Sequence, residues 1–524
     1  MIDRRDFLKI SAIAGTGTLA GFSSFKNSGI RSFSLCTNTT VLNSNPEFLE
    51  LIAGSGVTDV WLPVFLNGYW AYPMEDLLLW KKKIEKKGIA VHSLSVPLGH
   101  PGSSLGNDAS FDTTPQRWPR SVDLDGKLYS GTSVHPIVTD ENKAVIQKVN
   151  QAGFKKLFLD DDFRLARSPG NIGGCFCADH QKDFLSKYGY VENDWTDLKQ
   201  NIKDRNLTSV LNSWINFNCD QLTASFKAQQ AAAPDVELGI MVMYLGSEKA
   251  GIRLTDYKGS LMRVGELMFE DKHFSPVKGK TDELFSALFH RRFVTPEMAF
   301  SETTAYPATK LSAPNMAAKL HISTIADVRN TMMMSGLEPF PFTHWSTLAP
   351  VMKKAANMHK KIAGQKLRGP LKHYWGESSR LVGTDKPYSL FLASGIPFEV
   401  TETPASDGWT FLSDFDAKDV HTGKLKTNGT TFGYGSGTDQ KLNGLRFQAE
   451  NLQEIFALKH EIIPQIKGVP YVEEDKPVVC AWYPDIKRVL LWNLSETKES
   501  FTINLNDKKS TVEIGGLDAE LVHL

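Results

Sequence analysis

The amino-acid sequence predicts an α/β protein that begins with a (β/α)8 TIM barrel and continues into two smaller domains. One observation is a recurring unit within residues 30–365, in which an amphipathic helix, a glycine and a short apolar strand follow one another. A second is that polar and aromatic side chains follow many of these strands. Barrel enzymes carry functional groups at the C-terminal mouths of successive strands, whereas a doubly wound sheet concentrates them at one switch point, so the barrel is favoured.

The recurring unit accounts for four of the expected barrel strands. Glycine directly after a helix is a common C-cap, because its left-handed conformation carries no steric penalty from a Cβ atom. The strands that follow are short and nearly continuously apolar, which fits a parallel sheet buried on both faces. The units are Leu49–Ala53, Gly56 and Val57–Leu62; Leu77–Lys87, Gly88 and Ile89–Val96; Lys143–Ala152, Gly153 and Phe154–Leu159; and Ile322–Ser335, Gly336 and Leu337–Phe342.

The pattern changes twice after the barrel. In residues 366–470, a helix at Tyr388–Ala393 and strands at Gly395–Val400 and Trp409–Asp414 indicate a smaller α/β domain. In residues 471–524, short strands separated by turn residues indicate a small antiparallel β domain. These strands are Val478–Trp482, Arg488–Asn493, Phe501–Leu505, Thr511–Ile514 and Glu520–Leu524.

Composition excludes several classes of protein. The chain has 524 residues, 41% hydrophobic and 23% charged, as in a globular protein and unlike collagen, a coiled coil or a disordered chain. Its 59 basic and 59 acidic side chains cancel, so charge gives no reason to expect nucleic acid or an anionic membrane as a partner. The five cysteines are an odd number and widely scattered apart from one pair, which argues against a disulfide framework.

Residues 1–25 have the pattern of an export signal. The run Arg4-Arg5-Asp6-Phe7-Leu8-Lys9 resembles the twin-arginine signal of bacteria and precedes a mildly apolar stretch, Ile10–Phe22. This stretch is shorter than the roughly 20 apolar residues that a membrane-spanning helix needs. We therefore expect a periplasmic or secreted protein with no membrane span in its mature form.

Three adjacent carboxylates, Asp160, Asp161 and Asp162, follow the apolar strand that ends at Leu159. Crowded carboxylates repel one another, which raises at least one pKa and can keep one group protonated as a general acid. Side chains alternate along a strand, so Asp160 and Asp162 should share a side that Asp161 opposes. A solvated acidic loop or a helix N-cap is the alternative interpretation.

A cysteine and histidine pattern follows the aspartates. At Asp160-Asp161-Asp162 and Cys175-Phe176-Cys177-Ala178-Asp179-His180 the sequence resembles the family 42 glycoside hydrolases, the β-galactosidase family of clan A. That family has an Asp-Asn-Glu run after the fourth strand, a Cys-x-Cys-x-x-Cys zinc cluster downstream and a Cys-Pro dipeptide upstream, where this chain has His135-Pro136. The resemblance implies Asp162 as acid/base, although aspartate replaces glutamate there, and Asp161 in the asparagine position.

The same resemblance implies a zinc site built from His135, Cys175, Cys177 and His180. Two thiolates and two imidazoles form a good tetrahedral zinc set, which would leave no coordination position open for catalysis. Buried thiols and surface histidines without a metal are the alternative. No cofactor is expected for catalysis itself.

A second carboxylate, Glu302, follows the apolar run Met298-Ala299-Phe300 of the expected seventh strand. This is the position at which clan A enzymes carry their nucleophile. A retaining glycosidase needs that carboxylate about 5–5.5 Å from the acid, where it can attack the anomeric carbon. A salt-bridged structural glutamate is the alternative, and Glu248 and Glu266 are competing candidates on neighbouring strands.

Further candidates for substrate contact lie at the expected strand ends. Aromatic rings there can stack on the C–H faces of a sugar, although core packing explains any single one of them equally well. The candidates are Asp160, Trp61, Trp70, Tyr244, Tyr306, His344 and Trp345.

These features together indicate an exported retaining exo-glycosidase that acts on an oligo- or polysaccharide, with a β-galactoside-type substrate expected from the resemblance. A substrate-assisted hexosaminidase that uses the adjacent aspartates, and a non-catalytic carbohydrate-binding barrel, are the alternatives. The three-part layout also resembles family 42 proteins, which implies a flavodoxin-like middle domain used for trimer assembly and a small C-terminal β-sandwich.

Overall fold

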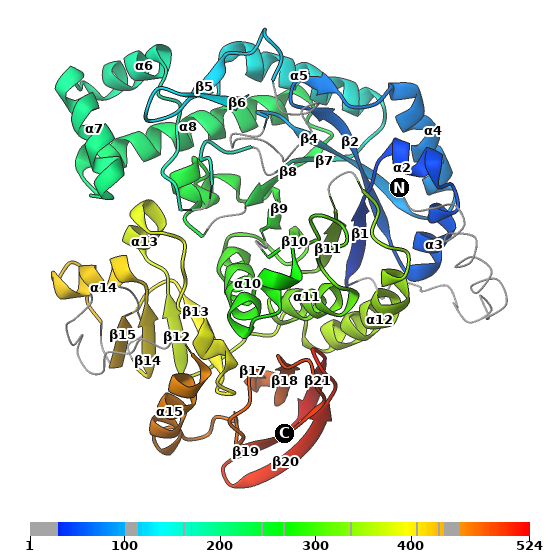
Figure 1. The fold of residues 1–524 in the computed structure, drawn as a ribbon, viewed down its shortest axis with the longest axis vertical. Coiled ribbons are helices and arrows are strands. Elements are labelled where there is room, and N and C mark those ends of the chain that lie inside the picture. The colour runs from blue at the N-terminus through cyan, green and yellow to red at the C-terminus, as the bar shows by residue number, and fades with distance from the viewer. Residues whose placement is uncertain are drawn as a thin grey trace.

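The computed structural model describes residues 30–99, 114–160, 163–168, 170–242, 245–265, 268–335, 338–404, 407–427, 430–433 and 451–524. The export signal predicted at residues 1–25 lies outside these ranges. Figure 1 shows a barrel surrounded by helices, a second sheet beside it and a β-rich C-terminal part. In the described part of the chain, no helix is long and apolar enough to cross a membrane.

Eight parallel strands form a closed barrel, as the sequence predicts. The strand order is β1-β2-β4-β7-β8-β9-β10-β11, and β1 pairs with both β2 and β11, which closes the ring. A short strand, β3 (Tyr69–Trp70), extends β2 as an antiparallel hairpin. The barrel strands are β1 (Ser32–Cys36), β2 (Asp59–Leu66), β4 (Ala90–Val96), β7 (Lys156–Leu159), β8 (Glu237–Val242), β9 (Leu261–Val264), β10 (Ala299–Thr304) and β11 (Asn330–Met334).

Amphipathic helices connect the barrel strands and bury their apolar faces against them. In α4, for example, Leu77, Trp80 and Ile84 recur at helical spacing and are buried, whereas the lysines between them face outward. Gly56 ends α3 in the left-handed conformation with φ 93°, as its predicted C-cap position requires. The main helices are α2 (Thr39–Ser44), α3 (Phe48–Ser55), α4 (Met74–Glu85), α5 (Pro136–Gln151), α6 (Ala178–Tyr188), α7 (Glu192–Asp204), α8 (Ser209–Ala232), α10 (Val277–His290), α11 (Ala313–Ile325) and α12 (His344–Ile362).

The eighth strand lies earlier in the chain than the sequence pattern suggests. The predicted helix Ile322–Ser335 and strand Leu337–Phe342 are wrong, because α11 ends at Ile325 and the strand is β11. The chain turns at Asp327, whose φ of 51° is left-handed and stops the helix before the apolar methionines begin. Those methionines suit a strand as well as a helix, so periodicity misassigned them.

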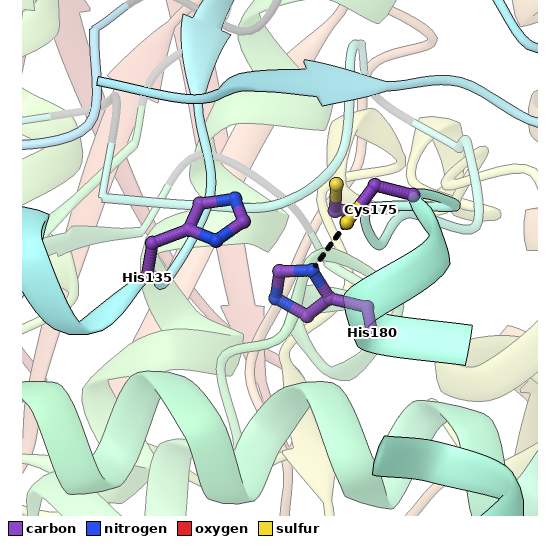
Figure 2. Close-up of side chains that lie close together, drawn as sticks. His135, Cys175 and His180 are labelled. Carbon is purple, nitrogen blue, oxygen red and sulfur yellow. Dashed lines mark hydrogen bonds between the residues drawn. The ribbon is translucent and has the colours of Figure 1, made fainter. Parts of the chain in front are cut away.

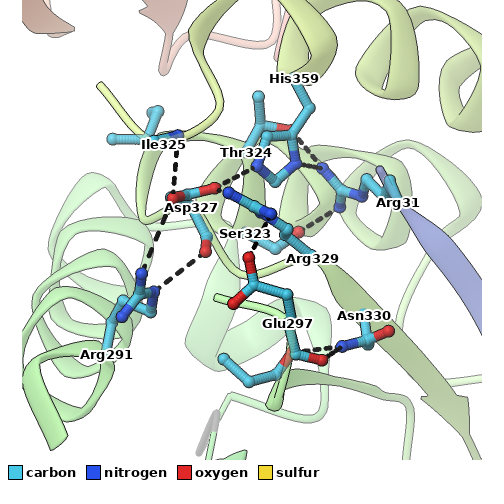
Figure 3. Close-up of polar contacts among 12 residues, drawn as sticks. Arg31, Arg291, Glu297, Ser323, Thr324, Ile325, Asp327, Arg329, Asn330 and His359 are labelled. Carbon is cyan, nitrogen blue, oxygen red and sulfur yellow. Dashed lines mark hydrogen bonds and ion pairs between the residues drawn. The ribbon is translucent and has the colours of Figure 1, made fainter. Parts of the chain in front are cut away.

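A cluster of ion pairs closes the N-terminal end of the barrel (Figure 3). Arg31, which precedes β1, is 1% exposed and donates hydrogen bonds to the Leu320 carbonyl (3.2 Å) and to Thr331 Oγ1 (2.9 Å). His359 Nε2 on α12 lies 2.8 Å from Asp327 Oδ1. These contacts connect the first strand to the last two helices, and groups at this end of a barrel serve stability rather than catalysis.

The middle domain contains a four-stranded parallel sheet in the order β13-β12-β14-β15. The connection from β12 to β13 leads toward one edge of the sheet, and the connections to β14 and β15 lead toward the other edge, as in doubly wound sheets. The predicted helix Tyr388–Ala393 is a 3-10 turn, η5 (Leu390–Ala393). The elements are β12 (Leu371–Tyr374), α13 (Glu377–Val382), β13 (Phe398–Thr401), β14 (Trp409–Leu412), α14 (Asp414–His421), β15 (Thr430–Gly433) and α15 (Leu452–Ile462).

The C-terminal part consists of two three-stranded antiparallel sheets, β16-β19-β20 and β17-β18-β21. Their facing sides bury an apolar cluster that includes Cys480, Leu491 and Phe501. All five predicted strands are present. The strands are β16 (Tyr471–Val472), β17 (Val478–Tyr483), β18 (Arg488–Asn493), β19 (Glu499–Leu505), β20 (Lys508–Ile514) and β21 (Ala519–His523).

Candidate active site and metal centre

The interior of the barrel is filled by side chains that alternate with those facing the helices. On β7, Leu157 and Leu159 belong to the large cluster under the helices, whereas Phe158 belongs to a separate cluster inside the barrel. Asp160 continues the inward side of this strand. The inner cluster consists of Cys36, Trp61, Leu94, Phe158, Leu261, Phe300 and Met332, each from a different strand.

Above this apolar layer, Arg263 of β9 joins the two strands that carry the predicted acids. Its Nη2 donates a hydrogen bond to Asp160 Oδ1 and lies 4.0 Å from Glu302 Oε1. Arg263, Asp160 and Glu302 are 1%, 5% and 3% exposed. The structure therefore brings the ends of the fourth and seventh strands together in the barrel interior, with one guanidinium between their carboxylates.

The surroundings of Arg263 are unusually rich in sulfur. The Sδ atoms of Met241 and Met332 lie 2.7 and 3.0 Å from its Nη2 and Nη1. Burial raises the pKa of the Cys36 thiol to about 12, and Asp160 and Glu302 add to this shift while Arg263 opposes it. The thiol therefore stays protonated at neutral pH and places no further anion beside the two carboxylates.

Glu302 is held by a neighbour on its own strand as well as by Arg263. Thr304 Oγ1, two residues further along the inward face of β10, donates a hydrogen bond of 2.8 Å to Glu302 Oε1. Residues Asp161, Asp162 and Tyr244, and the competitor Glu266, lie outside the described residues, so the separation between Asp162 and Glu302 stays a prediction. The backbone N–H of Phe163 donates to the Asp160 carbonyl (2.8 Å), which fixes the two ends of the segment containing Asp161 and Asp162.

Two of the predicted substrate-binding rings are buried in the core instead of lying at the barrel mouth. β2 runs to Leu66, so Trp61 lies within the strand, is 0% exposed and packs against Phe158 and Phe300. Trp345, in the first turn of α12, is 1% exposed. The expectation for Trp61 assumed that β2 had ended before the ring, and that for Trp345 assumed a strand end where α12 begins. Both rings contribute to packing.

Three other candidates keep accessible surface. Tyr306, after β10, is 50% exposed. Trp70 on β3 is partly exposed and packs edge-on against Phe65. His344, the first residue of α12, is partly exposed, and its Nε2 lies 3.0 Å from the Leu311 carbonyl oxygen.

The four predicted metal ligands, His135, Cys175, Cys177 and His180, lie together. Figure 2 labels three of them, His135, Cys175 and His180. One ligand atom from each can be chosen so that all four lie within 4.8 Å of one another. His135 directly precedes α5, and Cys177 and His180 lie at the start of α6. The group could therefore hold a metal ion such as zinc.

The electrostatics of this group suit a thiophilic metal. A hydrogen bond with Cys175 lowers the pKa of Cys177, with a further contribution from His180, whose Nδ1 lies 3.0 Å from Cys177 Sγ. The same hydrogen bond raises the pKa of Cys175, so the pair retains one proton that a metal would displace. His135 Nε2 is buried and has no hydrogen-bond partner in the described part of the chain, as expected of a metal-facing nitrogen.

The helices α6, α7 and α8 surround the metal-ligand loop with an aromatic core of their own. Phe176, between the two cysteines, packs against Trp195 and Trp214. Trp214 Nε1 donates a hydrogen bond of 2.9 Å to the Gly173 carbonyl. This core fixes the loop that runs from the aspartates to the metal group.

Sequence reasoning missed Arg263. The available signal was a cation inside the short apolar strand Leu261–Val264, where a charged side chain needs a buried partner.

Comparison with known proteins shows similarity of fold. No family model matches the sequence, and no curated protein matches it. A family 42 β-galactosidase from G. stearothermophilus, solved as a catalytic mutant, aligns with a TM-score of 0.60 at 9% identity over 94% of this chain and 98% of that one. A β-galactosidase from Bacillus circulans sp. alkalophilus gives the same TM-score and identity over 94% and 99%. The chain has the fold of the family 42 β-galactosidases.

This family 42 fold extends over the barrel and the additional small sheets, as the sequence resemblance implies. An α-L-fucosidase, isoenzyme 2 from Paenibacillus thiaminolyticus, also aligns, with a TM-score of 0.52 at 10% identity over 91% of this chain and 93% of that one. Glycosidases that act on different sugars therefore share the architecture.

Proposed function

We propose that the protein is a retaining exo-glycosidase that hydrolyses a β-galactoside-type bond. The observation that carries this proposal is the meeting of the Asp160 and Glu302 carboxylates at Arg263, inside a barrel of the family 42 type. A retaining mechanism needs two carboxyl groups on opposite sides of one sugar-sized gap. The closeness of the ends of the fourth and seventh strands in this barrel supports such a pair.

The roles follow from the ion pair of Asp160 and from the family resemblance. Asp160 forms the buried ion pair with Arg263, so it supports the floor of the site and does not transfer protons. We assign the acid/base role to Asp162 and sugar contact to Asp161, as the family resemblance implies. Glu302 is the nucleophile.

In the first step Asp162 protonates the glycosidic oxygen while Glu302 attacks the anomeric carbon, and a covalent glycosyl-enzyme forms as the leaving group departs. In the second step Asp162 removes a proton from water, which attacks the same carbon and releases Glu302. Trp70, Tyr244, Tyr306 and His344 are the side chains that we propose to contact the sugar.

His135, Cys175, Cys177 and His180 would hold a structural zinc ion, whose bonds would connect α5 to the loop before α6. If all four coordination positions were taken by these side chains, such an ion would fix the loop, and no step of the proposed reaction uses it. We further propose that the protein is exported by the twin-arginine route and that the middle domain forms a homotrimer interface.

A second candidate function is carbohydrate binding without catalysis. The deep burial of Glu302 and its proximity to Arg263 favour it, because a nucleophile must reach the substrate. Measuring hydrolysis distinguishes these two functions, and hydrolysis by a Glu302 variant also tests the hexosaminidase alternative.

The test is hydrolysis of a panel of nitrophenyl glycosides, with the β-galactoside first, by wild type, Asp162→Asn and Glu302→Gln. The proposal requires turnover by wild type and its loss in both variants. Activity that survives Glu302→Gln would instead indicate substrate-assisted catalysis. Sugar binding without turnover of any glycoside would indicate the binding protein.

A further inference from the structure

The carboxylate of Asp385, in the middle domain, contacts two loops of the barrel. Asp385 Oδ2 accepts the backbone N–H of Gly170 (3.0 Å), and its Oδ1 accepts that of Gly246 (3.0 Å). The same Oδ1 lies 2.6 Å from Lys249 Nζ. Gly170 lies in the loop after β7, which begins with the three aspartates, and Gly246 and Lys249 lie in the loop after β8. Asp385 therefore satisfies donors that are 215 and 139 residues away in the chain.

The contact is buried and charged. The side chains of Lys249 and Asp385 are 1% and 3% exposed, so solvent does not screen their attraction. A second ion pair, between Arg380 and Glu248, lies beside the first. Removal of either partner would leave the other charge buried without solvent, so this contact is costly to break.

Arg205 closes the arrangement from the helical side. It donates to the carbonyls of Val382 and Gly383 in the middle domain (2.8 and 2.9 Å) and to the Gly170 carbonyl in the barrel loop (2.6 Å). Gly170 is therefore held through both its N–H and its C=O by groups that depend on docking of the middle domain. We name Asp385, Lys249, Arg205 and the two glycines the interdomain clasp.

The two barrel loops also fit the clasp sterically. A Cβ atom on Gly246 would lie 2.5 Å from the Arg380 carbonyl oxygen, and one on Gly170 would lie 3.0 Å from that of Thr384. Only residues without a side chain allow the middle domain to approach this closely.

The clasp acts on the segment between the aspartates and the metal group. The backbone N–H groups of Leu165 and Gly173 donate to the carbonyls of Ala250 and Lys249 (both 2.7 Å), so the two loops form one unit. This unit has Asp160 at one end and Cys175 at the other, with the clasp at Gly170 between them.

We infer that Asp385 is a positioning residue that holds the loop carrying the acid/base aspartate in register with Glu302. This inference rests on the proposed function. Docking of the middle domain and ordering of the loop after β7 are then one event, and the middle domain is part of the active-site machinery.

The test compares Asp385→Asn with Asp518→Asn in the full-length protein. Asp518 also makes an interdomain ion pair, 2.8 Å from Lys354 Nζ, but in the C-terminal part and without a contact to either loop among the described residues. Hydrogen exchange of the amides of Leu165, Gly170, Gly173 and Gly174 is followed by mass spectrometry, together with kcat and KM. We expect Asp385→Asn to speed exchange there by about tenfold or more, and Asp518→Asn to leave it as in wild type.

Activity supplies the second readout. Displacement of the acid by about 1 Å lowers kcat by roughly 100-fold, while the sugar-contacting rings keep KM within about threefold. A loss of thermal stability without these two changes would mean that the clasp only joins domains, and it would overturn the inference. If wild type hydrolyses no glycoside, the proposed function fails, yet the exchange experiment still decides whether the clasp orders the loop.

Should Asp385→Asn not fold, the double variant Asp385→Leu/Lys249→Met removes both buried charges and keeps the volume. It still deprives Gly170 and Gly246 of their acceptor, so the same faster exchange and lower kcat are expected. Exchange at the wild-type rate in this variant also overturns the inference.

Discussion

Arg263 is the best place to test how the barrel floor is held together. Replacing it with methionine leaves the carboxylates of Asp160 and Glu302 buried beside an apolar side chain. Both are at most 5% exposed, so water cannot compensate them, and breaking a buried pair in this way costs about 3–5 kcal/mol of unfolding free energy. The surrounding methionine sulfurs are weak acceptors and provide no donor that could replace the guanidinium.

Arg253→Met is the matched control. Arg253 lies 2.9 Å from Asp220 and 3.1 Å from Asp256, but its side chain is 30% exposed, so its loss should cost about 1 kcal/mol or less. The assay is urea-induced unfolding of each variant, with the shift in free energy compared for the transition in which the barrel unfolds.

A double variant sharpens the comparison. Arg263→Met combined with Asp160→Asn removes one charge of each sign. The double variant should therefore lose less unfolding free energy than the two single variants lose in sum, by about 1–3 kcal/mol. If Arg263→Met destabilises no more than Arg253→Met, or if the two single losses simply add, the buried ion pair does not have the role assigned to it here.

Two further predictions concern the metal group and the middle domain. Purified protein should hold about one zinc ion per chain, and Cys177→Ser should reduce this below half an equivalent by metal analysis, whereas Cys219→Ser, at a buried thiol outside the group, should not. Burial lowers the pKa of His373 to about 3. Because the unfolded chain protonates this imidazole near pH 6.5 and the folded chain does not, stability is retained above pH 6.5 and lost as the pH falls, by about 2 kcal/mol between pH 6.5 and 5. The unfolding free energy of His373→Phe should not fall over this pH range. His460→Gln, which replaces an exposed histidine of the same domain, should lose as much stability as wild type. The same dependence of unfolding free energy on pH in wild type and both variants would contradict the reasoning.

Elements with a single strong periodicity could be predicted from the sequence. The lysine-rich helix at Leu77–Lys87 and the strand ending at Leu159 are where their patterns indicate, because helical and strand spacings differ clearly there. The methionines of β11 fit both spacings, and only tertiary pairing with β1 and β10 decides between them. Trp61 was misplaced for a related reason, since nothing local shows that β2 continues to Leu66.

Residues whose role depends on distant partners could not be predicted. The metal group was found because two of its cysteines lie close together in sequence and a family pattern supplied His135. Arg263 and Asp385 have no local motif, and each acquires its role from groups on other strands or in another domain. Long-range ion pairs of this kind are invisible to periodicity and composition.

The segment from Asp160 to Cys177 is constrained at both ends and in the middle. Arg263 fixes its first residue, the interdomain clasp holds Gly170, and the metal group with its aromatic surroundings fixes its last residues. An acid/base must keep its carboxyl group within a fraction of an ångström of a productive position, and a loop loses least entropy on substrate binding when its ends are already ordered. A loop serving only to connect β7 to α6 would need none of these three attachments. Their convergence on the segment that carries the three aspartates supports the proposal that this segment provides the acid/base.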